Sequence, residues 1–322
     1  MRVGIIGPGA MAGLYGGQLA LSGVDVCLIE KDPTAVTNIK TNGLQLSGIG
    51  GEHTMALEIE SEAANLAPVD IAFIHTDTNN TASAAQHAGQ ILKPEGFAIT
   101  FQNGIGNVEI LQSELGAERV MGGISYHSAR LQSPGHSVHT NANKTWIGEL
   151  DGERSTRAEH LATLLNDAGF VVELVEDIDA VIWTKFVLNC AVNPICAITG
   201  FRTGEIGQDV SGRHFQMLIV DEILTLIAAR NITLQDPDIR TTINNFSGKL
   251  FNKPSMLQHM EKGLVTEIES LNGAAVRAAQ ELGLDMPYNN ALTLLIKACS
   301  TRTIRALHGP TIDYVALEAE AS

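Results

Sequence analysis

A lysine and two asparagines recur every fourth residue in an otherwise apolar stretch. Lys185, Asn189 and Asn193 lie within residues 181–194, where most other residues are aliphatic or aromatic. Each helical residue turns by about 100°, so positions four apart differ by only ~40° and the three side chains share one face. Burial lowers the pKa of a lysine toward neutrality, as a general acid–base requires. The pattern therefore indicates an acid–base site on a helix that kinks or ends near Pro194. The structural alternative is a polar face turned to water.

Two further polar residues in the C-terminal half stand near predicted helix starts. Ser255 opens the segment 255–258, and Glu267 lies in the segment 266–269. Both segments have the S/T-x-x-E/Q form of a capping box, which is a structural explanation for both residues. Local spacing alone therefore selects neither of them as catalytic.

The N-terminus contains a glycine-rich turn between a strand pattern at residues 2–6 and a helix pattern at residues 11–22. Its residues are Gly7, Pro8, Gly9, Ala10, Met11 and Ala12, in the form GxGxxA. In this context the motif predicts dinucleotide binding, with the pyrophosphate at the helix N-terminus. The alternative is a glycine turn without a ligand.

The end of the second predicted strand carries two residues with opposite implications for the cofactor. Glu30 lies roughly 20 residues after the glycine turn, where an acidic residue bonds the ribose of NAD and repels the 2′-phosphate of NADP. Lys31 follows it and could hold that phosphate. A solvated turn pair is the third reading, so cofactor choice stays open at this point.

Asn103 follows another predicted strand, at residues 97–102. Ligands of open α/β sheets bind at the carboxyl ends of strands, so Asn103 is a candidate to contact the cofactor or Lys185. A turn residue that tolerates the left-handed conformation is the alternative.

The elements that must position these residues change in character along the chain. Up to about residue 177, short apolar runs alternate with helical patterns, which predicts βαβ units and a parallel sheet. Beyond that point helical periods replace the strand patterns. We expect an α/β protein: a Rossmann-type, doubly wound dinucleotide-binding domain at residues 1–177 and an all-helical substrate and catalytic domain at residues 178–322.

Composition restricts the classes of partner. The 322 residues include 21 Lys and Arg against 36 Asp and Glu, a net charge of −15, which disfavours nucleic-acid binding. The four cysteines form no CxxC, so we expect no metal site and reduced thiols. The N-terminal apolar run is too short for a signal peptide. No apolar stretch is long enough without polar interruptions to predict a membrane span. We expect a cytoplasmic protein, with the helical half offering a surface for a homodimer.

Taken together, the motifs of both halves resemble the ketopantoate reductase (2-dehydropantoate 2-reductase) family. The likeness spans most of the chain in the same order: the glycine turn, QNGIG at 102–106, WTKFVLN at 183–189 with Asn193-Pro194, PSMLQ at 254–258, and TEIESLNG at 266–273.

This resemblance implies reduction of the 2-oxo group of ketopantoate to pantoate by a nicotinamide cofactor, in pantothenate biosynthesis. It implies that Lys185 is the general acid, that Glu267 lies near the substrate hydroxyl and orients the lysine, and that Asn103 contacts the cofactor. The substrate-binding positions that it implies are Asn189, Asn193 and Ser255. NADPH is the family default, and Glu30 leaves NADH open.

Two positions depart from the family pattern. Asp77 stands where members commonly carry a lysine, and Glu30 precedes Lys31 where a basic residue is common. A carboxylate cannot replace a cationic contact to cofactor or substrate. A related reductase acting on a different 2-oxo acid is therefore one alternative, and a non-catalytic dinucleotide-sensing protein is another, since fold alone does not fix function.

Overall fold

The computed structural model describes residues 1–312 and 318, and the chain divides into two compact units. The N-terminal unit is Met1–Trp183 and the C-terminal unit is Thr184–Ser322. The division falls within helix α6 (Ile178–Thr199), so one continuous helix contributes to both units. The functional division expected at residue 177 stays a prediction.

An eight-stranded sheet forms the centre of the N-terminal unit, in the order β12-β11-β8-β7-β6-β1-β2-β5. All neighbouring pairs are parallel except β8 with β11, which is antiparallel. Its strands are β1 (Arg2–Ile6), β2 (Asp25–Ile29), β5 (Glu58–Glu60), β6 (Val69–Ile74), β7 (Leu92–Thr100), β8 (Val120–Ser125), β11 (Lys144–Glu149) and β12 (Val171–Leu174).

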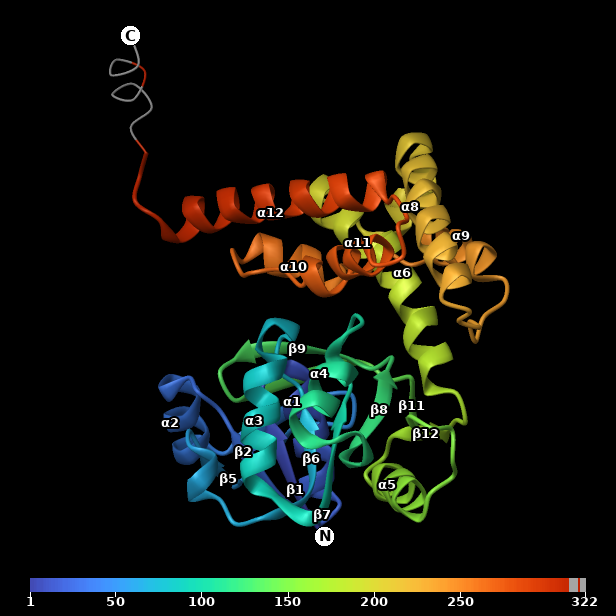
Figure 1. Cartoon of the computed structure of the whole chain (residues 1–322). Coiled ribbons are helices and arrows are strands. Elements are labelled where there is room, and N and C mark those ends of the chain that lie inside the picture. The colour runs from blue at the N-terminus through green and yellow to red at the C-terminus, as the bar shows by residue number, and fades with distance from the viewer. Residues whose placement is uncertain (313–317, 319–322) are drawn as a thin grey trace. The chain divides into compact units, whose positions relative to one another are not determined.

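Helices cover both faces of this sheet. Alternate residues of β1 point to opposite faces, so Ile5 and Ile6 belong to different core clusters. The Ile5 cluster includes helices α1 (Ala10–Leu21) and α5 (Thr156–Asp167). The Ile6 cluster includes α3 (Thr81–Ile91) and α4 (Asn107–Leu115), which lie over the strands in Figure 1. This is the doubly wound α/β arrangement that the sequence predicts.

A second, four-stranded sheet has the order β4-β3-β10-β9 and packs against α1. Its strands are β3 (Leu44–Gly48), β4 (His53–Met55), β9 (Ser128–Ser133) and β10 (His136–Asn141), and helix α2 (Pro33–Asn42) precedes β3. The approach of α1 to β10 depends on Gly13, since a Cβ at this position would overlap the buried Ser137.

We expect Gly13→Ala to lower the free energy of unfolding by about 1–3 kcal/mol, because β10 would have to move away from α1. Urea denaturation measures the change. Gly248→Ala is the matched control: this helical glycine faces open space, so alanine is expected to stabilise its helix by about 0.8 kcal/mol. A Gly13 variant as stable as the parent would contradict the packing role.

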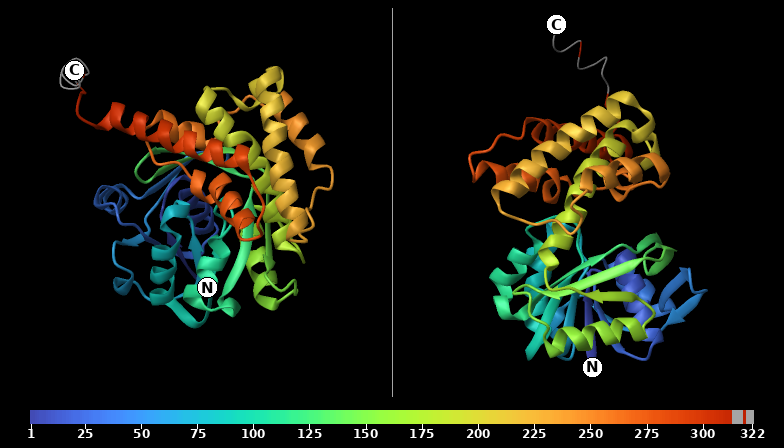
Figure 2. Two further views of the ribbon diagram at one scale, coloured as in Figure 1. Left: turned by 45° about the horizontal axis from the view of Figure 1, so that its top comes forward. Right: turned by 90° about the vertical axis from the view of Figure 1, so that its right-hand side faces the viewer.

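The C-terminal unit is helical. It contains the rest of α6 and the following helices: α7 (Thr203–Gln208), α8 (Val210–Ala229), α9 (Ile239–Lys249), α10 (Ser255–Glu261), the short 3₁₀ helix η4 (Ile268–Ser270), α11 (Asn272–Gln280) and α12 (Pro287–His308). Helix α12 packs against α8, α10 and α11 (Figure 2). Phe186 and Cys190 of α6 are fully buried in this unit, as are Ile219 and Ile223 of α8.

Of the two outcomes predicted at Pro194, a kink or an end of the helix, the end was wrong, since α6 continues through the proline to Thr199. Buried side-chain amides from α8 and α11 donate to α6 carbonyls just before Pro194. These tertiary donors supply hydrogen bonds to the backbone in this segment, where a proline removes one.

Candidate active site

The turn after β1 has a backbone conformation that requires glycine. Gly7 adopts a φ of +82°, and its N–H donates to the carbonyl of Ile29 at the end of β2. A Cβ at Gly7 would lie 2.9 Å from the Cα of Thr76, which follows β6. The turn thus brings together the carboxyl ends of three neighbouring strands, where open α/β sheets bind ligands.

The N-terminus of α1 is built to receive an anion. Gly9 is the N-cap, no side chain caps it, and the first turn carries no acidic residue. A Cβ built on Gly9 would have only the Gly7 carbonyl nearby, at 4.0 Å, so space is open beside it. Gly9, Ala10 and Met11 are half-buried, whereas Pro8 and Ala12 are buried. The uncapped N–H groups and the open approach fit a pyrophosphate.

A pocket beside this turn contains both of the residues that predict cofactor choice. Its lining includes Gly7, Gly9, Glu30, Lys31 and Asp77. Glu30 accepts a hydrogen bond from the backbone N–H of Asp32 at 2.9 Å.

Lys31 Nζ donates to Ser83 Oγ of α3 at 2.7 Å. Three lining residues, Glu30, Asp32 and Asp77, carry carboxylates, against the single ammonium of Lys31. His87, also in the lining, has a pKa lowered mainly by burial and further by the charge of Lys31. The balance of charge in this pocket is therefore negative.

A network of polar side chains that the sequence did not reveal fixes the loops after β6 and β7. Gln102 Nε2 donates to the Thr76 carbonyl at 2.8 Å and to Thr81 Oγ1 at 3.0 Å, and Thr81 is also bonded to Asn107 Oδ1 at 3.0 Å. Asn107 Nδ2 donates to the carbonyl of the half-buried Asn103 at 2.9 Å. In the sequence, only Gln102 at the end of a predicted strand could have indicated this network, because its hydrogen-bond partners come from separate segments of the chain.

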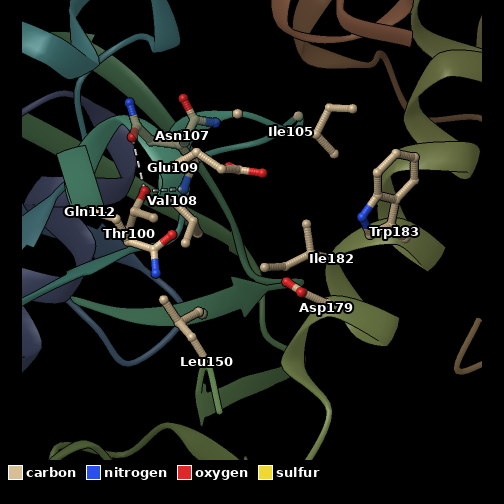
Figure 3. A pocket seen from close by; sticks show the side chains of 14 residues that line it. Thr100, Ile105, Asn107, Val108, Glu109, Gln112, Leu150, Asp179, Ile182 and Trp183 are labelled. Carbon is tan, nitrogen blue, oxygen red and sulfur yellow. Dashed lines mark hydrogen bonds between the residues drawn. The ribbon is translucent and has the colours of Figure 1, made fainter. Parts of the chain in front are cut away.

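A second pocket of the N-terminal unit adjoins this loop (Figure 3). Glu109 of α4 and Asp179 of α6 both line it, together with Ile182 and Trp183. Burial raises the pKa of Asp179, and the charges of Glu109 and Asp177 raise it further. The lining of this pocket carries two carboxylates and neither a lysine nor an arginine to offset them, so we assign this pocket no ligand.

Helix α6 places the predicted polar stripe as the spacing implied. Asn189 and Asn193 are buried and Lys185 is half-buried, among the buried apolar residues Phe186 and Val187. The stripe therefore does not lie on a fully solvated face.

Lys185 and Glu267 form an electrostatic pair within the C-terminal unit. Burial lowers the pKa of Lys185 to about 8, and the negative charge of Glu267 acts in the opposite direction. Glu267 is half-buried at the N-cap of η4. The lysine thus gives up its proton more readily than an exposed lysine but stays largely protonated at neutral pH.

The capping-box interpretations of Ser255 and Glu267 were wrong. Pro254 is the N-cap of α10, Ser255 is its exposed first residue, and Gln258 donates to the Lys253 carbonyl instead of closing a box. The predicted box required Thr266 at the N-cap, but Glu267 is the N-cap residue of η4 and no side chain caps this helix. Their side chains are therefore not explained by helix capping.

Two further features of the structure bear on other kinds of site. Within residues 1–312 and 318, no group of three or more His, Cys, Asp or Glu side chains is arranged to hold a metal ion. In the same part of the chain, α6 alone is long and apolar enough to span a membrane, and 83% of its most apolar window is buried. Burial of this kind is typical of a core helix.

Comparison with known proteins defines the class of enzyme: the chain is an NAD(P)H-dependent oxidoreductase of the 2-dehydropantoate 2-reductase type. It belongs to the ketopantoate reductase family. The family model described as Ketopantoate reductase PanE/ApbA matches residues 3–152, and the model of the C-terminal part matches residues 177–300. A 2-dehydropantoate 2-reductase of Archaeoglobus fulgidus is 32% identical over 297 residues, covering 92% of this chain and 97% of the relative.

Solved structures show the same fold. A PanE/ApbA family ketopantoate reductase from Ralstonia eutropha JMP134 is 27% identical with a TM-score of 0.87, over 94% of this chain and 99% of that one. A D-mandelate dehydrogenase, solved with NADH and anilino(oxo)acetate, is 26% identical with the same TM-score and the same coverage. Proteins with this fold therefore include enzymes that are named for different acids.

Proposed function

We propose that this enzyme reduces the 2-oxo group of ketopantoate to the hydroxyl of pantoate, in pantothenate biosynthesis, with Lys185 as the general acid. The observation that carries the proposal is the half-buried Lys185, whose pKa is about 8, on the same helix face as Asn189 and Asn193. A reduced oxo group becomes an alkoxide unless a proton reaches its oxygen. An ammonium group poised near neutrality is suited to supply that proton.

The remaining residues of the proposed site bind the substrate and orient it toward Lys185. A bound nicotinamide cofactor supplies the hydride that reduces the oxo carbon. Lys185 Nζ donates its proton to the oxo oxygen, while the carboxylate of Glu267 keeps the lysine protonated until then and accepts from the substrate hydroxyl. The side-chain amides of Asn189 and Asn193 and the hydroxyl of Ser255 hydrogen-bond the polar groups of the substrate.

The glycine turn would hold the cofactor. Gly7, Pro8, Gly9, Ala10, Met11 and Ala12 provide the turn and the first turn of α1 for the pyrophosphate, Glu30 and Lys31 line the pocket beside it, and Asn103 lies in the loop after β7. Although NADPH is the default that the family resemblance implies, we propose that this chain prefers NADH. The carboxylates of Glu30, Asp32 and Asp77 repel a 2′-phosphate.

Steady-state kinetics test the reaction and the cofactor together. We expect ketopantoate to be reduced with either cofactor, with a kcat/KM for NADH about tenfold or more above that for NADPH. A tenfold ratio corresponds to about 1.4 kcal/mol, less than the several kcal/mol that like charges in contact can cost. No cofactor oxidation with ketopantoate would overturn the substrate assignment, and a preference for NADPH would overturn the cofactor assignment.

A second candidate is a related reductase that acts on a different 2-oxo acid. Asp77, in place of a family lysine, and the similarity to a D-mandelate dehydrogenase favour it. The same assay with pyruvate, 2-oxoisovalerate and phenylglyoxylate decides: a higher kcat/KM for one of these than for ketopantoate would select this candidate.

We further propose a cytoplasmic location and a homodimer. All four cysteines are unpaired and none is fully exposed, which suits a reducing compartment. Exposed apolar residues of the C-terminal unit, such as Val210 and Leu294, offer surface for association. Sedimentation analysis of the purified protein measures the oligomeric state.

A further inference from the structure

Helix α6 contains a proline where a regular helix has a hydrogen-bond donor. Pro194 has no N–H, and at this position the N–H would donate to the carbonyl of Cys190, four residues earlier. The proline ring also crowds that carbonyl. Because Cys190 is fully buried, its carbonyl oxygen needs a donor from elsewhere in the protein.

That donor is the side-chain amide of Asn272, the first residue of α11. Asn272 Nδ2 lies 3.2 Å from the Cys190 oxygen, and it also donates to Asn289 Oδ1 at 2.9 Å. Neither Asn272 nor Asn289 has exposed surface. Asn289 Nδ2 in turn donates to the carbonyl of Ile219 and to Glu222 Oε2, both on α8. The Asn272 amide is thus held from one side by α8 and α12 while it binds α6 on the other.

This contact connects the two segments that carry the acid and its charge partner. Lys185 precedes Cys190 by five residues, about 7.5 Å along the axis of α6. Glu267 precedes Asn272 by the same number of residues, at the N-cap of η4. The hydrogen bond between Asn272 and Cys190 therefore fixes the position, along the axis of α6, of the segment that carries Glu267.

We propose that Asn272 is a positioning residue, which binds the carbonyl that Pro194 leaves open on α6 and thereby holds Glu267 beside Lys185. This inference rests on the proposed roles of Lys185 and Glu267. Its consequence is electrostatic: the charge of Glu267 opposes the effect of burial on Lys185, so a displaced Glu267 lets the lysine lose its proton at lower pH.

The Asn272→Leu variant tests this inference, because leucine keeps the side-chain volume and removes the donor. We expect kcat to fall about tenfold and the alkaline limb of the kcat/KM profile to move down by about 0.5 pH unit. The pKa of Lys185 in the substrate-free protein is measured in parallel, from the pH dependence of its acetylation by acetic anhydride, read by mass spectrometry. We expect the same downward shift there.

Gln216→Leu is the matched control. Gln216 also has no exposed surface, and its Nε2 donates to the next α6 carbonyl, of Ala191, at 3.1 Å and to Ser247 Oγ at 2.8 Å. It connects α6 to α8 and α9, not to the Glu267 turn. We expect this variant to lose stability like Asn272→Leu but to keep the parent pH profile and the parent Lys185 pKa. Equal shifts in both variants, or none in Asn272→Leu, would overturn the positioning role.

Pro194→Ala provides a second test that does not depend on Asn272→Leu folding. Alanine restores a backbone donor to the Cys190 carbonyl, which then competes with the Asn272 amide. We expect a smaller shift of the Lys185 pKa in the same direction, and a parent value would count against the proposal. Failure of the proposed function is distinguishable, because loss of the Lys185 role would show in Lys185→Ala while the acetylation measurement would still report on Asn272.

Discussion

Lys185→Ala is expected to lower kcat/KM for ketopantoate reduction by about 10²- to 10⁴-fold, the usual contribution of a positioned general acid. The affinity for NADH is expected to stay within about twofold of the parent, because the glycine turn and its pocket are formed by other residues. Steady-state rates give the first quantity, and titration of NADH fluorescence gives the second.

Two further lysine substitutions make the interpretation specific. Lys185→Arg keeps the positive charge, but a guanidinium does not release its proton near neutral pH, so the rate is expected to stay low. Lys249→Ala removes an exposed lysine at the end of α9 and is expected to leave the rate unchanged. Turnover near the parent value in Lys185→Ala would remove Lys185 from the mechanism.

The pH dependence follows from the same residue. Lys185 acts as an acid only when protonated, and its pKa is about 8. Below that pH the proton is present and kcat/KM is expected to be level, whereas above it the rate is expected to fall about tenfold per pH unit. The parent profile measured from pH 6 to 10 checks this, and a rate that still rose above pH 9 would contradict the assignment.

The polar stripe could be predicted from the sequence because it is a local pattern. Lys185, Asn189 and Asn193 share a face through helical periodicity alone, and the fold class followed from the alternation of strand and helix patterns. The glycine turn was recognisable for a similar reason, since its structural requirements lie within a few consecutive residues.

Features that depend on distant segments could not be predicted in this way. The partner of Lys185 is Glu267, 82 residues further along the chain, and local sequence assigned that residue to a capping box that does not form. Pro194 predicted a kink or an end of α6, and the helix does not end there. The side chains of Gln216 and Asn272 donate hydrogen bonds to α6 near the proline, and the local sequence could not reveal these donors. In each case a tertiary contact overrides a local preference.

Glu30→Gln is expected to reduce the preference for NADH over NADPH by about 10- to 100-fold. Glu30 lines the pocket beside the glycine turn and directly follows β2. In the proposed binding mode its carboxylate would repel a 2′-phosphate and accept a hydrogen bond from a ribose hydroxyl. Glutamine keeps the shape of the side chain and removes the charge, so NADPH gains affinity and NADH loses a charge-assisted hydrogen bond. Dissociation constants for both cofactors, measured by fluorescence without substrate, report the change independently of turnover.

The control must remove one carboxylate charge, as Glu30→Gln does, from a residue outside the pocket. Asp25→Asn meets this requirement, because Asp25 lies at the opposite end of β2, five residues or about 16 Å from Glu30 at 3.3 Å per residue, and pairs with Arg2. It is expected to change the two cofactor affinities equally or not at all. If Glu30→Gln left the NADH to NADPH ratio at the parent value, the carboxylate would not be in contact with the ribose. Asp77, which lines the same pocket, would then be the next residue to exchange, for the lysine common in the family.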